Sequence, residues 1–224
     1  MKFVVMSDTH NRHRDLKIPD GDILIHAGDA TSGGQLSEVA DFAAWFAAQP
    51  HRIKILVAGN HDFAFQDDYE NAVDILKNAG GIVYLQDAAY QIESDDGPIR
   101  IWGAPWQPWF HNWAFNLRGA ELKAVWDLIP RDTEVLITHG PPFEVLDETN
   151  RGDCVGCKYL RKRILEIKPK LHICGHIHEG YGLASLGTTS VMNCSICDLS
   201  YKPVNRPLVF QYNKGIIKMS KISD

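Results

Sequence analysis

The chain alternates short runs of apolar residues with segments in which apolar residues recur at helical spacing. Each run has the length of a strand, is rich in β-branched side chains, and is bounded by Gly, Asp or Pro. Runs of this kind predict buried strands. The predicted strands are Phe3–Met6, Ile23–His26, Ile53–Ala58, Ile99–Trp102, Val135–Thr138 and Leu171–Cys174.

Between these runs, apolar side chains recur at positions i, i+3, i+4 and i+7, which is the spacing of one helix face. This pattern predicts three helices, centred on Val39–Phe46, Ala72–Ala79 and Leu122–Ile129. A fourth helix is expected near Val155–Ile167. Ser37 is the expected N-cap of the first helix, Gly80-Gly81 ends the second, and Pro130 ends the third. The fourth helix is expected to end before Pro169.

The C-terminal part, residues 190–219, lacks helical spacing and predicts short strands, with Pro203 and Pro207 placing some of it at an edge or in a loop. Since no linker rich in Pro, Gly or Ser divides the chain, we expect one domain over residues 1–224. The succession of strands and helices predicts an α/β or mixed α+β class.

The composition is that of a globular protein, with 45% hydrophobic and 23% charged residues in 224. The formal net charge of −5 provides no electrostatic attraction for a stable nucleic-acid complex or an anionic membrane. The first apolar run reaches Ser7 and Asp8 too soon for a signal peptide or a membrane span. We therefore expect a cytoplasmic protein that binds a small anionic partner at a local site, and a homodimer remains open.

Five cysteines include two Cys-x-x-Cys pairs, Cys154/Cys157 and Cys194/Cys197. An odd number of cysteines without an export signal argues against a disulfide framework. A four-thiolate zinc site and a redox dithiol are alternatives, but the gap between the pairs is longer than the roughly 15–20 residues of the usual zinc pattern. We expect ordinary reduced thiols that take part in packing.

Metal-capable side chains directly follow five of the predicted strands. In sheets covered by helices, ligands collect beyond the carboxyl ends of the strands, so these five loops are expected to converge. Gly28, Gly59, Gly140 and Gly175 adjoin four of the loops and suit tight turns and close backbone approach. The candidate ligands are Asp8, His10, Asp29, Asn60, His139, His176 and His178.

This set of imidazoles, carboxylates and one amide is larger than a single ion uses, whereas two ions that share one carboxylate would use it well. The mixed nitrogen and oxygen donors suit Mn, Fe, Zn, Co or Ni rather than Ca or Mg. A metal pair fits hydrolysis of a phosphoryl ester, because each ion can hold one oxygen during an in-line attack. Any one of these histidines alone would more often be a turn or core residue; their recurrence at five strand ends indicates one site.

Several of these segments resemble a known family. The match is to the five signature blocks of the calcineurin-like metallophosphoesterases: Asp8-x-His10, Gly28-Asp29, Gly59-Asn60-His61-Asp62, Thr138-His139-Gly140 and Gly175-His176-Ile177-His178. Leu24–Asp29, Gly103–Phe110 and His176–Gly182 further resemble the metallophosphoesterase-domain-containing (brain-type) subfamily and its bacterial relatives, which include cyclic-nucleotide phosphodiesterases. Some animal members carry Gly in place of the first His of the last block, whereas His176 is present here. The resemblance implies a four-layer α-β-β-α sandwich, with two mixed β-sheets flanked by helices.

The resemblance also implies a role for each ligand. Asp8, His10 and His178 would hold one metal, and Asn60, His139 and His176 the other, with Asp29 bridging both and manganese favoured. A hydroxide that bridges the metals would be the nucleophile. His61 would contact the phosphoryl oxygen or protonate the leaving alkoxide, although Ser32 stands where the protein-phosphatase branch has the acidic partner of this histidine. The implied catalytic residues are His61, Asp29 and Asn60.

Four further residues are candidate substrate contacts. Arg12 and His13 follow the first ligand pair, and Trp106 and His111 belong to an aromatic segment, residues 102–113, that either stacks on a nucleobase or packs in the core. The expected activity is metal-dependent hydrolysis of small phosphodiesters, chiefly 2′,3′- or 3′,5′-cyclic AMP or GMP. The alternatives are a phosphomonoesterase or nuclease of the same superfamily, and a catalytically weak nucleotide-binding protein.

Overall fold

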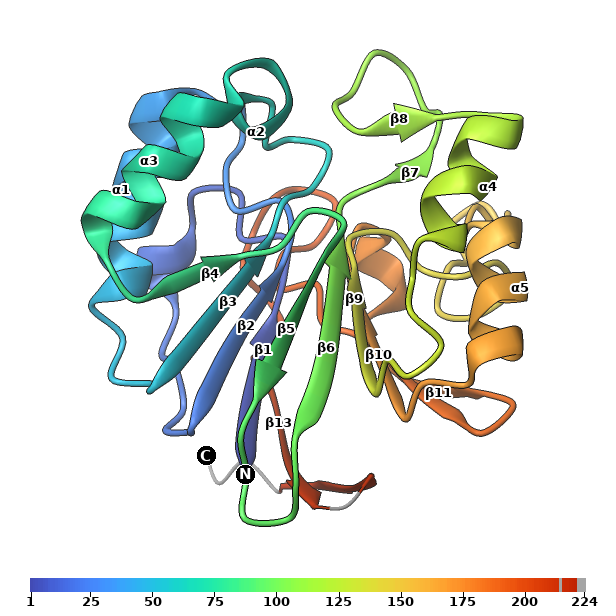
Figure 1. Ribbon diagram of the computed structural model, residues 1–224. Helices are drawn as coiled ribbons and strands as arrows, with labels where there is room; N and C mark the ends of the chain where they lie inside the picture. Colours follow the sequence, from blue (N-terminus) through green and yellow to red (C-terminus); the bar gives the residue numbers. More distant parts are fainter. Residues whose placement is uncertain (214, 221–224) are drawn as a thin grey trace.

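Two six-stranded sheets form the centre of the computed structural model, which describes residues 1–213 and 215–220 (Figure 1). The strand order is β14-β13-β1-β2-β3-β4 in the first sheet and β11-β12-β10-β9-β6-β5 in the second. The first sheet consists of β1 (Lys2–Met6), β2 (Ile23–Ala27), β3 (Ile53–Val57), β4 (Ile82–Tyr84), β13 (Leu208–Asn213) and β14 (Ile216–Met219). The second consists of β5 (Ala88–Ile92), β6 (Ile99–Ala104), β9 (Val135–Thr138), β10 (Leu171–Cys174), β11 (Gly182–Leu186) and β12 (Thr189–Asn193). A small separate sheet pairs β7 (Gln107–Pro108) with β8 (Asn116–Leu117).

Helices cover the outer face of each sheet, so the layers are helix, sheet, sheet and helix, which confirms the expected sandwich (Figure 1). α1 and α3 lie outside the first sheet, and α4 and α5 lie outside the second (Figure 1). The helices are α1 (Leu36–Ala47), α2 (Ala64–Asp67), α3 (Tyr69–Ala79), α4 (Gly119–Asp127) and α5 (Lys158–Ile167), with 3-10 turns η1 (His13–Asp15) and η2 (His178–Gly180). In the described part of the chain, no helix is long and apolar enough to cross a bilayer.

The strands are apolar at successive positions because both faces of each sheet are covered. In β1, Phe3 and Val5 belong to the cluster between the two sheets, whereas Val4 and Met6 belong to the cluster beneath α1 and α3. Side chains alternate between the faces of a strand, so a strand buried on both faces needs an apolar residue at each position. This explains why unbroken apolar runs, rather than alternating ones, predicted the strands.

The central strands are parallel, which brings their carboxyl ends to one edge. β1, β2 and β3 pair in parallel in the first sheet, and β6, β9 and β10 do so in the second. The two sheets are joined at this edge, where the Ser7 N–H donates to Cys194 O and the Ile196 N–H donates to Ser7 O, both at 3.0 Å. The loops that follow these strands therefore start from one rigid frame.

Several predicted boundaries need correction. α1 begins at Leu36, so Ser37 lies inside the helix; Gln35 is the N-cap and forms a capping box with Glu38. Ser37 matched the usual cap type, but the reciprocal bonds between Gln35 and Glu38 decide the start. α4 ends at Asp127, before the predicted stop at Pro130, and α5 begins only at Lys158, because Cys157 caps it. Gly80 does end α3, with a φ of 78°.

The structure also contains strands that the apolar pattern did not predict. β4, β7 and β8 have two or three residues each, too few for a recognisable period, and the burial of β5 is interrupted by exposed positions. In the C-terminal part, β12, β13 and β14 are short strands, and Pro203 and Pro207 lie outside them, as expected. Residue 214 of this part, and residues 221–224 of the predicted domain, lie outside the described residues.

His172 is a fully buried histidine inside β10 whose Nε2 lies 2.7 Å from Thr138 Oγ1. Burial lowers the pKa of His172 from 6.5 to about 3. At a pH between these two values, His172 binds a proton in the unfolded chain but not in the folded chain. Its contribution to the free energy of unfolding is therefore fully present above pH 6.5 and is lost as the pH falls. One such group changes the free energy of unfolding by about 1.4 kcal/mol per pH unit.

Replacing this histidine is expected to reduce the acid sensitivity of the fold. Between pH 6.5 and 5, the free energy of unfolding of His172→Leu should fall by about 2 kcal/mol less than that of the wild type. The measurement is a series of urea titrations with a chelator present, in which the slopes against pH are compared rather than the absolute stabilities. Identical slopes would show that His172 does not contribute.

Gly103 in β6 lies against Leu85 and Val57, and the latter belongs to β3 of the other sheet. A Cβ added there would lie 2.5 Å from Leu85 Cβ and 2.9 Å from Val57 Cγ2. Gly103→Ala is therefore expected to lower the free energy of unfolding by about 1–3 kcal/mol through overpacking. The matched control is Gly140→Ala, whose new Cβ would have no neighbour nearer than 3.8 Å. Equal stability of the two variants in urea titrations would contradict this expectation.

Candidate metal centre

The loops beyond the parallel strands bring the predicted ligands together. Within the described residues, three groups of potential ligands each have their donor atoms within 4.8 Å of one another. The groups share His10 and Asp29, so they form one continuous cluster. Their members are Asp8, His10 and His178; His10, Asp29 and His61; and Asp29, His139 and His176. We refer to these residues without His61, together with Asn60, as the ligand cluster.

One half of the ligand cluster is built around Asp8. Its Oδ1 lies 3.4 Å from His178 Nε2, and His178 Nε2 lies 3.3 Å from His10 Nε2. His178 Nδ1 lies 2.9 Å from the carbonyl oxygen of Asp198, which accepts its proton and so turns Nε2 toward the cluster. Ser195 Oγ donates to Asp8 Oδ2 at 2.9 Å and holds the carboxylate in place.

The other half is built around Asp29, whose carboxylate also faces His10 of the first half. Asp29 Oδ2 is 3.3 Å from His139 Nε2 and 3.7 Å from His10 Nε2. Asn60 Oδ1 lies 2.9 Å from His139 Nε2, and His139 Nδ1 donates to the Ala27 carbonyl at 3.0 Å. The donor atoms of His139, Asn60 and Asp29 therefore face the same point.

Opposing effects of burial and charge set the pKa values of the cluster. Burial opposes charge on His178 and His139, but the Asp8 carboxylate raises the pKa of His178 to about 9, and Asp29 raises that of His139 to about 9. Burial likewise opposes ionisation of the two carboxyls, yet these histidines hold the pKa of both well below the ordinary value. Without metal, the carboxylates thus hold protons on the two rings.

This donor set fits divalent transition metals. Burial lowers the pKa of His10 to about 4 and that of His176 to about 3, so both rings are neutral and can offer a lone pair. Buried imidazoles and carboxylates that converge on one point are ligands of Zn, Mn and Fe, and a metal ion would take the place of the protons on His139 and His178.

The backbone around the ligands is strained, and glycines make room for them. Asp8, Asp29 and His176 have φ values of 53°, 55° and 69°, a region that non-glycine residues rarely adopt. A Cβ on Gly59 would collide with Asp29 and lie 2.7 Å from His139 Cε1, and one on Gly175 would collide with Asp8. Gly28, Gly59 and Gly175 therefore allow the close approach expected of them, whereas Gly140 has room for a Cβ and does not.

Asp62, the last residue of the Gly-Asn-His-Asp block, ties two loops together. Its carboxylate accepts the N–H groups of Gly59 at 2.8 Å and Thr31 at 2.9 Å, and the Thr31 hydroxyl at 2.7 Å. Burial, together with the charge of Asp29, raises the pKa of Asp62 to about 6. Asp62 thus holds the loop after β3 against the loop after β2 rather than joining the cluster.

His61 is oriented by a backbone group in place of an acidic side chain. Its Nδ1 lies 2.7 Å from the Ser32 carbonyl oxygen, which accepts the Nδ1 proton. Serine at this position removes the acidic side chain of the protein-phosphatase branch, but the main chain of the same residue supplies an acceptor. The ring of Trp113 lies 4.1 Å from the His61 ring, centroid to centroid, and fixes its plane.

The structure brings only one of the four predicted substrate contacts to the site. Arg12 lines a hollow of about 400 Å³ beside His10 and His61. His13 instead points into the protein, where it is buried and its Nε2 lies 3.1 Å from Asp41 Oδ2. His13 begins η1, which contacts α1, and this turn directs the side chain away from the site.

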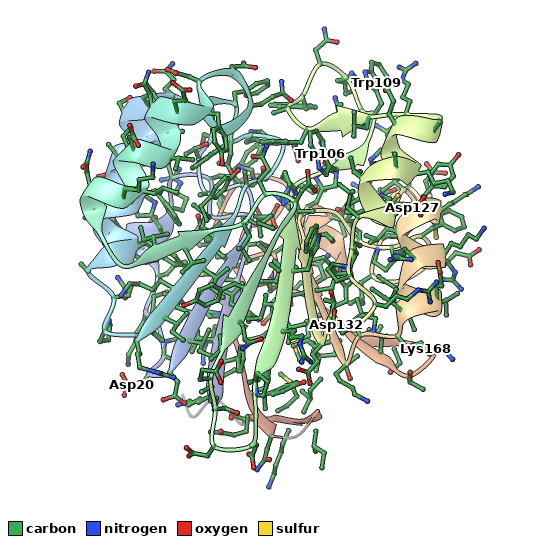
Figure 2. All side chains as sticks on the ribbon, viewed as in Figure 1. Asp20, Trp106, Trp109, Asp127, Asp132 and Lys168 are labelled. Atoms are coloured by element: carbon green, nitrogen blue, oxygen red, sulfur yellow. The ribbon has the colours of Figure 1, made fainter. Side chains whose placement is uncertain are left out.

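The other two predicted contacts lie off the ligand cluster. Trp106 donates from Nε1 to both carboxylate oxygens of Asp87, at 2.9 and 2.8 Å, and belongs to the packing beneath β7 and β8 (Figure 2). His111 is exposed with a φ of 50° and contacts Phe110. Neither lines the cavity above the ligand cluster, whereas Phe110 and Trp113 of the same segment do.

Tyr201 lies at the site, although no sequence motif predicted it. Tyr201 lies with its ring 4.7 Å from that of His10, centroid to centroid, and lines the cavity above the cluster. It comes from the loop between β12 and β13, which has no spacing or glycine pattern that marks a site. The junction of the two sheets at Ser7 and the bond from His178 to the Asp198 carbonyl bring this loop to the histidines.

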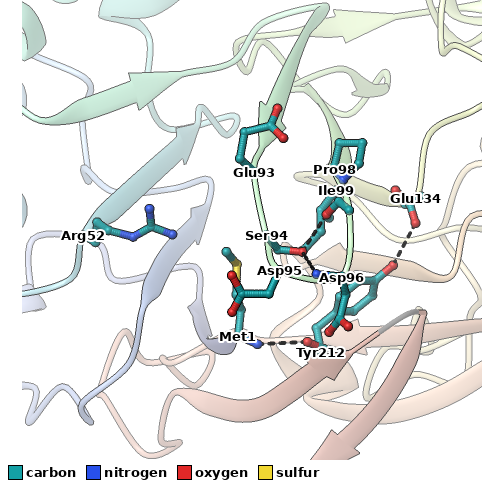
Figure 3. A pocket seen from close by; sticks show the side chains of 11 residues that line it. Met1, Arg52, Glu93, Ser94, Asp95, Asp96, Pro98, Ile99, Glu134 and Tyr212 are labelled. Carbon is teal, nitrogen blue, oxygen red and sulfur yellow. Dashed lines mark hydrogen bonds between the residues drawn. The ribbon is translucent and has the colours of Figure 1, made fainter.

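A further cavity, of about 280 Å³, lies beside the N-terminus (Figure 3). It is lined by residues at the amino ends of β1, β6 and β9, opposite the carboxyl ends that carry the ligand cluster. Its lining includes the carboxylates of Glu93, Asp95, Asp96 and Glu134 but only one cationic side chain, Arg52. Such a negative surface would repel a phosphate ester, and none of the ligand groups found among the described residues lies there. The candidate site is therefore the ligand cluster.

Four of the five cysteines take part in packing. Cys157, Cys174, Cys194 and Cys197 are buried, and Cys154 is exposed. Cys157 Sγ accepts the Leu160 N–H as the N-cap of α5 and the Trp126 Nε1–H at 3.2 Å. Within residues 1–213 and 215–220, none of the metal-capable groups includes a cysteine.

Comparison with known proteins agrees with this geometry. Residues 1–180 match the family of calcineurin-like phosphoesterases. Metallophosphoesterase domain-containing protein 1 of Homo sapiens is 41% identical over 93% of this chain and 70% of its own length. A UPF0046 protein of Caenorhabditis elegans is 35% identical over 94% of this chain and 59% of its own length.

The fold is also found among solved structures. Phosphopantetheinyl hydrolase from Mycobacterium tuberculosis superimposes with a TM-score of 0.63 over 92% of this chain and 95% of that one, at 15% identity, which is a likeness of fold alone. The sequence match, by contrast, spans all of the loops that carry the ligand cluster. The chain therefore belongs to the calcineurin-like phosphoesterase family of metal-dependent hydrolases.

Proposed function

We propose that this hydrolase acts on small phosphodiesters with two divalent metals, and that 2′,3′- or 3′,5′-cyclic AMP and GMP are among its substrates. The observation that carries the two-metal form is that two three-residue groups, one containing His10 and the other containing Asp29, are linked by a third group in which Asp29 and His10 meet. Asp29 Oδ2 lies within 3.7 Å of a nitrogen from each group, His10 on one side and His139 on the other. A single ion would leave half of these buried donors without a partner.

In this proposal Asp8, His10 and His178 hold one metal, Asn60, His139 and His176 hold the other, and Asp29 binds both. Manganese is the metal we expect. When bound, the metals supply positive charge to the phosphoryl oxygens and activate the attacking water. Ser195 holds Asp8 in place and the Ala27 carbonyl holds His139, so these two donors require little rearrangement to bind.

His61 is proposed to act on the ester rather than on the metals. With Nδ1 bonded to the Ser32 carbonyl, Nε2 is the nitrogen left for the ester, and the doubly protonated ring would donate from Nε2 to the phosphoryl or leaving-group oxygen. An alkoxide is a strong base, so its departure benefits from a positioned proton.

Small substrates are favoured over nucleic acid. The cavity that contains His61 and the ligand cluster measures about 210 Å³, and the chain has a formal net charge of −5. Binding of a long polyanion needs many Lys or Arg contacts to phosphates, whereas a single phosphoryl group can be held by the metals alone.

Removal of the shared carboxylate tests the two-metal proposal. Asp29→Asn and His139→Gln should each lower the manganese bound per chain and lower hydrolysis of bis(4-nitrophenyl) phosphate by more than about 100-fold. Metal content is measured by elemental analysis of the purified protein, and folding by circular dichroism. Asp74→Asn serves as the control, since it makes the same change at an exposed carboxylate of α3 that pairs with Lys77 and belongs to none of the ligand groups. Full hydrolysis by Asp29→Asn after metal loading would disprove the proposal.

The role of His61 is tested by the choice of leaving group. His61→Gln should keep its metals but hydrolyse a diester with an alkoxide leaving group about 100-fold more slowly or worse. Hydrolysis of a 4-nitrophenyl diester should suffer much less, because 4-nitrophenolate leaves without a proton. The ratio of kcat/KM for the two esters is the readout. An equal loss on both esters would indicate that His61 binds the phosphoryl oxygen and does not protonate the leaving group.

A further inference from the structure

Exposed apolar side chains border the cavity above the ligand cluster on two sides. Phe110 and Trp113 come from the loop between β7 and β8, and Leu199 and Tyr201 come from the loop between β12 and β13. Leu199 is 56% exposed, Phe110 55% and Tyr201 44%. Exposed apolar side chains around a cluster of polar residues are typical of a ligand-binding surface.

The backbone of Tyr201 is strained, and its loop is built to hold that strain. Tyr201 has a φ of 56°, a value that is costly for a large aromatic residue. The Tyr201 N–H donates to the Asp198 carbonyl at 2.9 Å, and the Asp198 carboxylate accepts the N–H groups of Ser200 at 2.8 Å and Lys202 at 3.0 Å. The same Asp198 carbonyl accepts from His178 Nδ1, so the loop and a proposed metal ligand are fixed together.

This strain places the Tyr201 ring above three histidines. Its centroid lies 4.7 Å from that of His10 and 6.0 Å from those of His61 and His178, with all three pairs edge-on. Trp113 lies on another side of His61, tilted by 33° at 4.1 Å. Two aromatic rings from different loops thus border the point at which a phosphoryl group would meet His61.

Tyr201 also stands between two hollows. Together with His10 and His61, it lines both the cavity of about 210 Å³ that contains Trp113 and the hollow of about 400 Å³ that contains Arg12. The first is bordered by apolar side chains, and the second by Arg12, Asn11 and Ser32. The two sides therefore suit different chemical groups: a flat apolar ring on the Trp113 side, and a polar or anionic group on the Arg12 side.

We propose that Tyr201 and Trp113 form an aromatic clamp that determines specificity by holding a planar ring attached to the phosphoryl group, while the Arg12 hollow receives the polar remainder. This inference rests on the proposed phosphoesterase function. The substrates selected are phosphodiesters in which one substituent carries a nucleobase or an aryl ring. The ring stacks against the aromatic side chains, and the strained loop keeps Tyr201 in position before the substrate arrives.

The clamp is tested by titrating manganese-loaded protein with phenylphosphonate and with methylphosphonate, followed by calorimetry. Both carry the same anionic group, neither is hydrolysed, and only one has a ring. The wild type should bind phenylphosphonate about tenfold more tightly. Tyr201→Asn removes the ring but keeps a residue that tolerates positive φ, and Trp113→Leu removes the other ring; each should bring the affinity ratio close to one.

Two controls separate the ring from general effects of substitution. Tyr201→Phe keeps the aromatic ring and should keep the preference. Tyr69→Asn makes the same change at a remote tyrosine that is 46% exposed, and should also keep it. Equal affinity of the wild type for the two phosphonates, or an unchanged preference in both Tyr201→Asn and Trp113→Leu, would overturn the clamp.

Hydrolysis of bis(4-nitrophenyl) phosphate by the same wild-type preparation reports separately on the proposed function. Metal-dependent hydrolysis without the phosphonate preference would overturn the clamp and keep the function. The preference without any metal-dependent hydrolysis would overturn the function and keep a ring-selective anion site.

Discussion

A buried carboxylate between two groups of imidazoles is the constraint on which the rest of the structure depends. Asp29 is 2% exposed, so its charge requires partners. The backbone N–H of His61 donates to Asp29 Oδ1 at 2.8 Å, while Asp29 Oδ2 faces His139 and His10. These partners come from the loops after β3, β9 and β1. A sandwich in which two parallel strand systems end at the same edge can supply all of them, and the strained, glycine-flanked loops bring them within reach.

Much of this arrangement could be predicted because it depends on local patterns. Unbroken apolar runs marked strands covered on both faces, and the side chains directly after the runs marked the edge where they meet. The capping of α1 by Gln35 and the two-residue strands β7 and β8 were not predictable, because reciprocal side-chain bonds and pairing with distant segments decide them.

The residues of the ligand cluster were easier to predict than those that line the cavity above it. A ligand must follow a strand end and often adjoins a glycine, so sequence order points to it. His13 and Trp106 lie near the motifs in the sequence, but their side chains turn toward Asp41 and Asp87. Tyr201, by contrast, is far from His10 in the sequence and yet contacts it. The proposed recognition of substrate thus depends on loops whose positions follow from how the sheets join, whereas the ligand cluster comes from motifs within single loops.

Anomalous scattering from crystals loaded with manganese tests the two-metal arrangement most directly. Two peaks about 3.5–4 Å apart are expected, with the Asp29 carboxylate between them, one beside Asp8, His10 and His178 and the other beside Asn60, His139 and His176. A single peak at full metal saturation, or two peaks that do not share Asp29, would contradict the proposed site.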